Sequence, residues 1–432
     1  MSTRTWMRIC AVAAAALAAV VPAAGAAAPG APGAKSAWEP ADKEGFGTAT
    51  TRGSRVWHTL RAGALSEVYF PDLGTPSVRS LEFLVSDGRT FTDRESEARH
   101  RVVLADDRSL TYRQVTGSRA HGWSITKTWV TDPARNTLVA RVRFQTRGNR
   151  HLKLYVLYDP ALANSGDDDR GHSRDAALVA SDGKAASALT TAPALRATSS
   201  GFLGVSDGWT DLRSDHRLDW RYASAAPGNL VQTGLTSLTG RPGRRDLTLA
   251  LGFGGAEPAA RSAARASLRT GFRRVAGSYA DGWDGYLSEL RKPPASSRRH
   301  RTLYSVSAMV LAALEDKSFP GASVASPSMP WAWGDGETEN PSGPYHLVWA
   351  RDLYHVATAQ IAAGDREAAR RSLRYLFERQ QKPDGSFPQN SEVDGTQRWE
   401  NLQLDEVGLP LVLAWQLRDF GPETWSEHVK TR

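Results

Sequence analysis

Two short segments in the last quarter of the chain contain the residue types with which proteins bind sugars. The first segment contributes Tyr345, Trp349, Arg351 and Asp352. The second contributes Trp399, Gln403, Asp405 and Glu406. Aromatic rings stack on the apolar faces of pyranose rings, while guanidinium and carboxylate groups form charge-assisted hydrogen bonds to neighbouring hydroxyls. The two segments therefore predict a site for a neutral, polyhydroxylated ligand.

Each segment also has an ordinary structural explanation. An Arg-Asp pair at the start of a helix is often a capping and surface pair. Trp349 and Trp399 are large enough to be core residues. The residue types alone leave both interpretations open.

Five segments together resemble glycoside hydrolase family 15, the glucoamylases and glucodextranases, and within it the bacterial two-domain branch. They are Leu65–Pro71, Leu81–Gly88, Tyr345–Asp352, Gln381–Asn390 and Trp399–Pro410. The resemblance covers nearly the whole chain after its N-terminal segment. It implies an exo-acting, inverting hydrolase that releases glucose from the non-reducing ends of α-glucans.

The resemblance also implies a role for each site residue. Tyr345, Arg351 and Asp352 would line the subsite for the non-reducing terminal glucose. Trp349 would support them, and Trp399 would be the platform under the next sugar. Gln403 and Asp405 would lie at the pocket wall. An α-glucan oligosaccharide or polysaccharide is thus the expected partner.

The catalytic carboxyl groups are where the sequence departs from the family. Inverting glycosidases need an acid and a base about 6.5–9.5 Å apart. By resemblance, the acid lies in a Trp-Glu-Glu segment beyond the Gln-x-Asp-Glu cluster and the base lies further on, and neither segment occurs here. We therefore expect a chain truncated within its catalytic domain, with catalytic residues unknown. Glu406 is a candidate acid because it adjoins Asp405, but adjacent helix residues diverge, which favours a substrate contact.

Three functions are compatible with the sequence: an exo-acting α-glucosidase cut short, a noncatalytic α-glucan-binding protein, and a relative of the disaccharide phosphorylases, which share the expected architecture. Preference for α-1,4 or α-1,6 linkages also stays open. The complete protein is expected to be a monomer. A partial helical domain leaves apolar faces uncovered, so the chain as given is expected to aggregate or swap domains. A soluble monomer that unfolds cooperatively would contradict that expectation.

The N-terminal residues 1–28 are predicted to be a secretory signal, and the protein is expected to be secreted. Arg4 and Arg8 precede an apolar run from Ala11 to Val21 and a run of small residues. The apolar run is shorter than the ~20 residues that a membrane span needs, so no membrane span is expected. The single cysteine, Cys10, lies inside this segment, which predicts a mature chain without disulfides.

The formal charge of +8 raises the question of nucleic acid as a partner. Positive charge is scattered along the sequence, and clusters such as Arg241–Arg245 and Arg298–Arg301 are typical of turns and linkers. No nucleic-acid recognition module is apparent, so no nucleic-acid partner is expected. A mild attraction to acidic cell-wall surfaces stays open.

After a spacer at 29–37, the pattern over residues 38–255 is that of β-strands. Apolar and polar residues alternate between punctuating Gly, Asp and Asn residues. The expected strands are Ala64–Phe70, Ser80–Val85, Leu110–Val115, Trp123–Val130, Thr137–Phe144, Leu152–Tyr158 and Leu247–Phe253. Their number and spacing predict a large antiparallel β-sandwich (supersandwich).

An acidic run from Gly166 to Gly171 suggests a calcium loop, but it lacks the helix–loop–helix spacing and the terminal glutamate. A solvated surface loop is the preferred interpretation. No His/Cys set has zinc-ligand spacing. We therefore expect no metal and no cofactor.

From residue 256 the apolar period becomes helical. A helical linker is expected over 256–300 and the first helices of an (α/α)6 toroid over 301–432. Expected helices are Trp349–Ala363, Arg366–Gln381 and Leu402–Leu417, preceded by a helix with an apolar stripe from Leu303 to Leu314. The long loop Ala322–Pro344, with Trp331 and Trp333, has a length that is usually functional.

Overall fold

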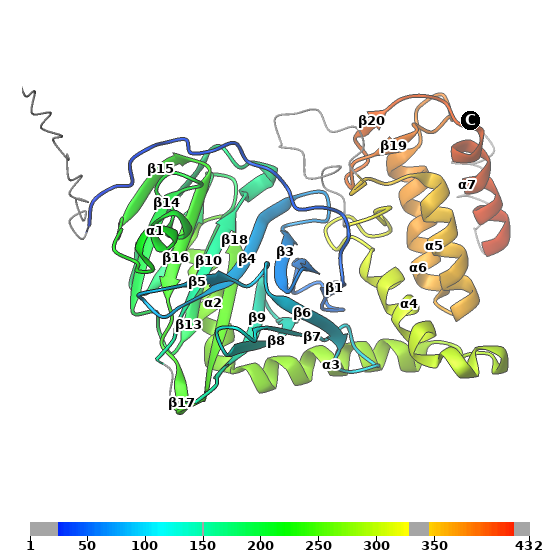
Figure 1. Ribbon diagram of the computed structural model, residues 1–432. Coiled ribbons are helices and arrows are strands. Elements are labelled where there is room, and N and C mark those ends of the chain that lie inside the picture. The colour runs from blue at the N-terminus through cyan, green and yellow to red at the C-terminus, as the bar shows by residue number, and fades with distance from the viewer. Residues whose placement is uncertain (1–24, 149–150, 328–344, 419–432) are drawn as a thin grey trace, which may run out of the picture.

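The computed structural model describes residues 25–148, 151–327 and 345–418, and in them a two-sheet β domain is followed by helices (Figure 1). Among these residues, eight strands form one sheet in the order β1-β2-β3-β4-β10-β16-β14, with β5 on β4. Ten strands form the other in the order β15-β11-β12-β13-β18-β9-β8-β7-β6, with β17 on β18. All of these pairs are antiparallel. The predicted antiparallel sandwich is confirmed.

The strands of the first sheet are β1 (Gly45–Thr48), β2 (Trp57–Arg61), β3 (Ala64–Tyr69), β4 (Pro76–Ser86), β5 (Thr92–Arg94), β10 (Lys153–Pro160), β14 (Ala197–Phe202) and β16 (Leu230–Leu235). Those of the second sheet are β6 (Arg99–Leu104), β7 (Tyr112–Ser118), β8 (Trp123–Thr131), β9 (Thr137–Thr146), β11 (Asp169–Arg174), β12 (Ala177–Ser181), β13 (Ala186–Ala192), β15 (Ser224–Gly228), β17 (Thr239–Arg241) and β18 (Arg244–Gly254). Each of the seven predicted strands overlaps one of these, with ends that differ by up to four residues.

The helices are α1 (Gly208–Asp215), α2 (Glu257–Thr270), α3 (Phe272–Glu289), α4 (Arg301–Ala313), α5 (Ala350–Ala363), α6 (Arg366–Tyr375) and α7 (Leu404–Leu417). Short 3₁₀ turns lie at Leu162–Asn164 and Ala295–His300, and a π turn at Leu376–Gln380 extends α6. A small hairpin, β19 (Asn390–Ser391) with β20 (Gln397–Trp399), precedes α7.

The core of the β domain lies between the two sheets, because successive side chains of a strand point to opposite faces. In β8 the alternation is regular, with Trp123, Ile125 and Trp129 buried. Trp57 and Phe83 of the first sheet are fully buried in the same apolar cluster. Large aromatic side chains therefore fill much of the space between the sheets.

A buried ion pair also lies between the sheets. The Nζ of Lys127 is 2.7 Å from Oε2 of Glu95, and neither side chain is exposed. The other Glu95 oxygen accepts a hydrogen bond from Thr116. Burial raises the pKa of Glu95 and lowers that of Lys127, because both charged forms lose hydration. Each charge is tolerated there only because the other is beside it.

The acidic run at 166–171 is not the solvated loop that the sequence predicted. Asp169 begins strand β11 and is fully buried, and its carboxylate accepts a hydrogen bond from the Leu162 amide at 3.1 Å. Burial raises the pKa of Asp169 well above its usual value. Asp167, Asp168 and Arg170 are exposed as predicted, but Asp169 between them turns inward at the start of the strand, which the run of like residues did not reveal.

The segment that precedes the first strand lies along the β domain. Ala27 bridges Ser224 of β15, and Asn229 donates backbone and side-chain hydrogen bonds to the carbonyls of Pro32 and Ala34. The expected spacer thus contacts the sandwich in its described part. Of the predicted signal 1–28, residues 1–24 lie outside the described residues.

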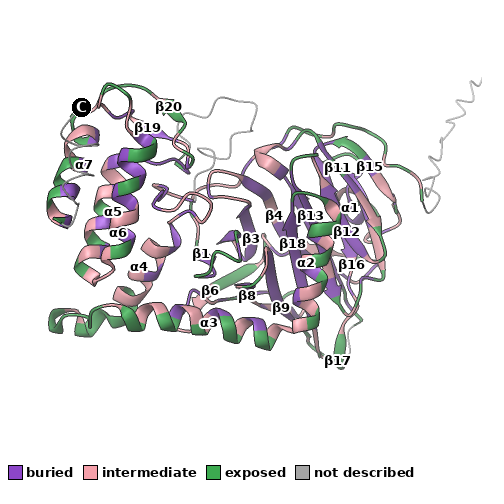
Figure 2. Ribbon diagram, turned by 180° about the vertical axis from the view of Figure 1, so that it is seen from behind, coloured by how far each residue is buried: buried purple, intermediate pink, exposed green. Residues whose placement is uncertain are grey.

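Helices α2 and α3 cover part of the outer face of the ten-stranded sheet (Figure 2). Gly252 of β18 permits the close approach of α2, since an added Cβ would lie 2.5 Å from the Ala260 carbonyl oxygen. The buried face of α3 consists of Val275, Tyr279 and Trp283, at the four-residue spacing of one helix side. The linker predicted from helical periodicity is therefore packed on the sandwich.

The helical part consists of α4 to α7, which pack side by side (Figure 1). Gly364, with φ of 99°, ends α5, and the Asp365 side chain begins α6 by accepting the Ala368 amide at 3.0 Å. The predicted stripe of α4 is buried only in part, because Leu303 is 64% exposed. Leu404 and Trp415 of α7 are also exposed, at 86% and 62%. The predicted loop residues Trp331 and Trp333 lie outside the described residues.

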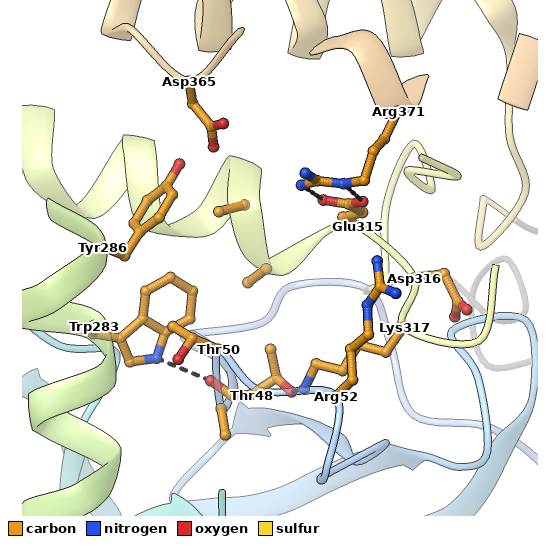
Figure 3. Close-up of a pocket in the computed structure, with 13 residues that line it drawn as sticks. Thr48, Thr50, Arg52, Trp283, Tyr286, Glu315, Asp316, Lys317, Asp365 and Arg371 are labelled. Atoms are coloured by element: carbon orange, nitrogen blue, oxygen red, sulfur yellow. Dashed lines mark hydrogen bonds and ion pairs between the residues drawn. The ribbon is translucent and has the colours of Figure 1, made fainter. Parts of the chain in front are cut away.

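A polar joint connects the sandwich to the helical part around a cavity of about 150 Å³ (Figure 3). Trp283 of α3 donates to the Thr48 carbonyl at 3.0 Å, and Arg371 of α6 forms a two-bond ion pair with Glu315 at 2.6 and 2.7 Å. Lys317 donates to the Ser54 carbonyl, and burial lowers its pKa to about 7. The Lys317 bond joins the segment after α4 to the sandwich, the Trp283 bond joins α3 to β1, and the Arg371 pair joins α6 to the segment after α4.

We predict that Lys127→Met lowers the free energy of unfolding by about 3–5 kcal/mol, because it leaves the buried Glu95 without its counter-charge. Urea unfolding followed by far-UV circular dichroism measures the loss. The double substitution Lys127→Met with Glu95→Gln should recover most of it, and the exposed Lys184→Met should change little. A loss below about 1 kcal/mol for Lys127→Met would contradict the role of the pair.

Candidate functional site

Three pieces of the chain meet at one end of the helical part, where α5 and α7 begin and the β19–β20 hairpin lies (Figure 1). Val348, just before α5, forms a two-way backbone bridge with Ser391 of β19, with N–O distances of 2.8 and 3.0 Å. The Trp399 amide donates to the Asn390 side chain at 3.1 Å. The sequence segments 345–352 and 399–406 are thus brought together, as their shared residue types suggested.

The guanidinium of Arg351 lies at the centre of the polar residues. Its Nη1 is 2.8 Å from Asp405 Oδ2, 3.1 Å from Glu406 Oε1 and 3.4 Å from Gln403 Oε1. Its Nε is 3.6 Å from Asp352 Oδ2. These contacts raise the pKa of Arg351 and, chiefly through the Arg351 hydrogen bond, lower that of Asp405. The predicted polar site residues therefore form one network.

The aromatic site residues form a second group beside that network. Tyr345 stacks on Trp349 with ring centroids 5.5 Å apart and an angle of 25°. Trp399 meets Trp349 edge-on, with ring centroids 5.8 Å apart. Trp349 is only 4% exposed, whereas Tyr345 is 43% exposed and Trp399 is half-buried. Trp349 therefore holds the other two rings in place, and they present surface to a ligand.

Glu406 has a different position from Asp405, because its side chain is fully buried. Its Oε2 accepts the backbone N–H of Arg351 at 2.9 Å. This N–H is one of the first amides of α5, which have no partner within their own helix. Glu406 thus caps α5 from α7 and fixes the backbone that carries Arg351.

Two effects oppose each other at the Glu406 carboxyl. The adjacent guanidinium and the N-terminal end of α5 favour the charged form. Burial disfavours it more, and the pKa of Glu406 is raised to about 7. A carboxyl that retains its proton near neutral pH is a recognised feature of general acids. Here the proton-bearing group is enclosed behind Arg351, which favours a positioning role.

Supporting residues that the sequence did not identify lie beneath the aromatic group. Gln380 donates to the Val348 carbonyl at 2.9 Å and to Ser391 Oγ at 3.0 Å. Tyr375 lies 3.0 Å from the same Ser391 hydroxyl. Both side chains are buried. In the sequence, the positions of Tyr375 and Gln380 look like those of ordinary core residues, so nothing there marked them as residues that support the site.

The arrangement can bind a ligand with adjacent hydroxyl groups. Arg351 Nη1 is occupied, while Nη2 has no hydrogen-bond acceptor in the described parts of the chain. The Asp352 side chain beside it is 40% exposed.

Within residues 25–148, 151–327 and 345–418, no group of three or more His, Cys, Asp or Glu side chains has a metal-binding arrangement. In the same residues, no helix combines the length and the apolar character that crossing a bilayer requires.

Two protein-family models match the chain. The glucodextranase N-domain model matches residues 28–288, and the model for glycosyl hydrolases family 15 matches residues 298–386. The first match covers the two-sheet domain with α2 and nearly all of α3. The second includes α4, α5 and α6 and reaches the segment before the β19–β20 hairpin.

Individual proteins are similar over most of the chain. A glucoamylase from Clostridium sp. (strain G0005) is 36% identical over 393 residues, which are 89% of this chain and 55% of that protein. The solved structure of a bacterial glucoamylase complexed with acarbose is 35% identical, with a TM-score of 0.87 over 94% of this chain and 60% of the other. A putative kojibiose phosphorylase from the human microbiome shares the fold at 10% identity and a TM-score of 0.52, over 90% of this chain and 51% of the other. The chain therefore spans between half and three fifths of the length of these proteins.

We predict that the stability of the native chain relative to the Glu406→Gln variant falls as pH rises from about 4.5 to about 7. The carboxyl has a pKa near 4.5 when free and about 7 when buried, so the unfolded state releases the proton first. The difference in unfolding free energy should change by about 3 kcal/mol across that window and stay constant above it.

Urea unfolding of both proteins at pH 4.5, 6 and 8 measures this difference, in which other titrating groups cancel. The exposed Glu378→Gln variant is the matched control and should show no such trend. A pH-independent difference for Glu406→Gln, or one of opposite sign, would refute the buried carboxyl's contribution.

Proposed function

The chain belongs to glycoside hydrolase family 15, in the branch that carries a glucodextranase N domain, and on that basis we propose that it binds the non-reducing end of an α-glucan at the Arg351 network. The complete protein of this kind would be an exo-acting, inverting hydrolase that releases glucose. The similar glucoamylase and the glucoamylase solved with acarbose support the choice of substrate class.

One observation carries the proposal: the guanidinium of Arg351 is held in place from one side and open on the other. Asp405, Glu406 and Gln403 all contact Nη1, so the planar group cannot rotate freely. The Asp352 carboxylate lies 3.6 Å from Nε of the same planar group, and Nη2 has no acceptor in the described residues. A planar donor beside a carboxylate acceptor matches two adjacent sugar hydroxyls, each of which donates and accepts.

The aromatic group supplies the complementary apolar contacts. Tyr345 and Trp399 retain exposed ring surface and are held by the buried Trp349. A sugar ring over either would shed water from its C–H face, as in other aromatic contacts. We assign Tyr345 to the terminal sugar, with Arg351 and Asp352, and Trp399 to the next one.

Hydrolysis with inversion needs one carboxylic acid to protonate the leaving oxygen and one carboxylate to activate water on the opposite face of the ring. Asp405 and Glu406 both contact the same guanidinium nitrogen, so they lie on one side of Arg351 and cannot flank a glycosidic bond. Their role in the proposal is to position Arg351. The acid and base would come from the part of the family 15 domain that these 432 residues do not span.

This engagement of both carboxyl groups favours a second candidate function, glucan binding without hydrolysis by the chain itself. The two candidates share the sugar site and differ in turnover. Incubating the chain with maltotetraose and following glucose and its anomer by NMR separates them. Release of β-glucose supports the hydrolase, and binding without release supports the noncatalytic candidate.

We predict that Arg351→Met weakens binding of acarbose or maltotetraose at least tenfold, because it removes hydrogen bonds from a charged donor, each worth about 1.5–3 kcal/mol. Trp399→Ala, which leaves the guanidinium network intact, should weaken binding several-fold through lost stacking. Isothermal titration calorimetry measures both.

The exposed Arg374→Ala on α6 is the matched control and should bind like the native chain. Thermal unfolding shows whether each variant is folded. Native affinity in both Arg351→Met and Trp399→Ala, or failure of the native chain to bind any α-glucan, would refute the proposed site.

A further inference from the structure

The outer face of the ten-stranded sheet has a covered part and an uncovered part. Where α2 and α3 pack on it, its side chains are Val130, Val139 and Ala250, all fully buried. Farther along the same strands, on the same face, the side chains become charged or hydroxylated. The change occurs along β8, β9 and β18, between the row of Val130, Val139 and Ala250 and the next row on the same face.

The strand register places the uncovered side chains in three rows across β6, β7, β8, β9 and β18. The rows are Val103–Arg113–Thr128–Arg141–Thr248, Arg101–Val115–Thr126–Arg143–Asp246 and Arg99–Gly117–Ser124–Gln145–Arg244. We call this surface the basic face and define it by Arg99, Arg101, Arg113, Arg141, Arg143 and Arg244. These arginines are far apart in the sequence, and the strand register places them on one face of the sheet.

The basic face has a large uncompensated charge. Asp246 is the one acidic residue in the three rows, and it pairs with Arg143 at 3.0 Å. Arg99, Arg101, Arg113, Arg141 and Arg244 have no ion pair with any acidic side chain in the part of the chain that the structure describes. Four of these five are exposed, and Arg141 is half-buried. Six arginines and one aspartate give the face a formal charge of +5.

The spacing of these charges concentrates their field. Neighbouring strands are about 4.8 Å apart and alternate residues of one strand about 7 Å apart. Several cations therefore lie within about one Debye length, ~8 Å at physiological ionic strength, and repel one another. An anionic polymer laid across the rows would relieve this repulsion at several points at once.

Two shallow grooves extend the basic face at its edges. One, of about 560 Å³, is lined by Arg99, Val115 and Gln145 together with Arg119 and Arg147. The other, of about 520 Å³, lies between Arg141 and Thr248 of the sheet and Arg273 and Arg274 of α3. A chain that follows the rows would therefore meet further arginines at both edges.

The residues between the arginines indicate what kind of polyanion fits. Arg113 and Arg141 are separated by Thr128 on the strand between them, and hydroxyl or amide groups recur in every row. Such groups pair with sugar hydroxyls, which a polyphosphate lacks. No aromatic side chain stands in the rows to stack on nucleobases, as single-stranded nucleic-acid binding requires. Arginine pairs with the planar carboxylate through two parallel hydrogen bonds.

We propose that the basic face binds a linear polysaccharide of uronic acids, whose carboxylates pair with the arginines and whose hydroxyls contact the intervening threonine and serine side chains. This site is on the β domain, away from the Arg351 network on the helices (Figure 1). Its ligand is acidic, whereas the ligand proposed for the helices is neutral. Binding here would hold the chain on an acidic glycan matrix independently of any glucan.

The test uses the full chain and polygalacturonate, with dextran, inorganic polyphosphate and single-stranded DNA as comparison probes. The variant Arg101→Ser with Arg113→Ser and Arg141→Ser removes three charges from the centre of the face. The matched control removes three exposed charges outside it, through Arg298→Ser, Arg299→Ser and Arg301→Ser. Affinity electrophoresis and calorimetry at low and physiological salt measure binding.

The proposal predicts that polygalacturonate binds the native chain more tightly than either polyphosphate or DNA at equal charge concentration, and that added salt weakens binding. The face variant should lose at least tenfold in affinity, and the control variant should lose less than threefold. Equal losses in the two variants would show attraction by net charge alone and overturn the proposal.

Tighter binding of DNA or polyphosphate would assign the face to another partner and also overturn it, as would no binding of polygalacturonate. If the triple variant does not fold, as thermal unfolding reports, the single exposed Arg113→Ser substitution replaces it and should lose two- to fourfold. Arg113→Lys keeps the charge but not the paired hydrogen bonds, and it should recover part of that loss. Unchanged maltotetraose binding by the face variant distinguishes this site from the proposed glucan site.

Discussion

The buried carboxyl group of Glu406 determines the geometry of the candidate sugar site. It belongs to α7, yet its hydrogen bond goes to the backbone of Arg351 at the start of α5. The N-terminal ends of two helices are thereby fixed to one another, and the Arg351 guanidinium is fixed with them. Glu406 Oε2 accepts the Arg351 amide, which has no partner within α5, while Oε1 lies 3.1 Å from the Arg351 guanidinium. Moving any of the three would change which donors face a ligand.

The β domain provides the rigid support for these helices. Aromatic core residues and the buried Lys127–Glu95 pair connect its two sheets, and α3 runs from the outer face of one sheet to the helical part. The contacts of Arg371 with Glu315 and of Lys317 with the Ser54 carbonyl complete the joint. The site is therefore positioned by a chain of packed and hydrogen-bonded elements. This arrangement restricts its motion relative to the sandwich.

The sequence predicted the parts of the fold that local patterns specify. Strands such as Trp123–Thr131 alternate regularly, and Gly364–Asp365 is an ordinary junction between two helices. Strands rich in small residues, such as Ala186–Ala192, contain a single large apolar residue, Leu189, and gave no such signal. The burial of Asp169 was missed because a single strand start lies inside an acidic run. A sequence pattern that spans only a few residues cannot reveal a hydrogen-bond partner from a distant part of the chain.

The same limit applies to function. The types and order of Tyr345, Arg351 and Asp405 predicted a sugar site, and the resemblance to the family added their roles. The capping bond from Glu406 and the support from Gln380 depend on tertiary contacts. The basic face depends on strand register, since its arginines come from four strands between residues 99 and 244. The proposed neutral-sugar site and the proposed anionic-glycan surface thus differ in where tertiary contacts place their residues, which the composition of the chain does not reveal.

A crystal structure of the chain with bound acarbose tests the central claim most directly. We expect the terminal ring to lie beside Tyr345, with two adjacent hydroxyls within hydrogen-bonding distance of Arg351 Nη2 and the Asp352 carboxylate, and the following ring against Trp399. Glu406 should remain buried against the Arg351 amide, without contact to the sugar. A sugar bound elsewhere, or one that contacts Glu406 directly while Arg351 turns away, would contradict the account.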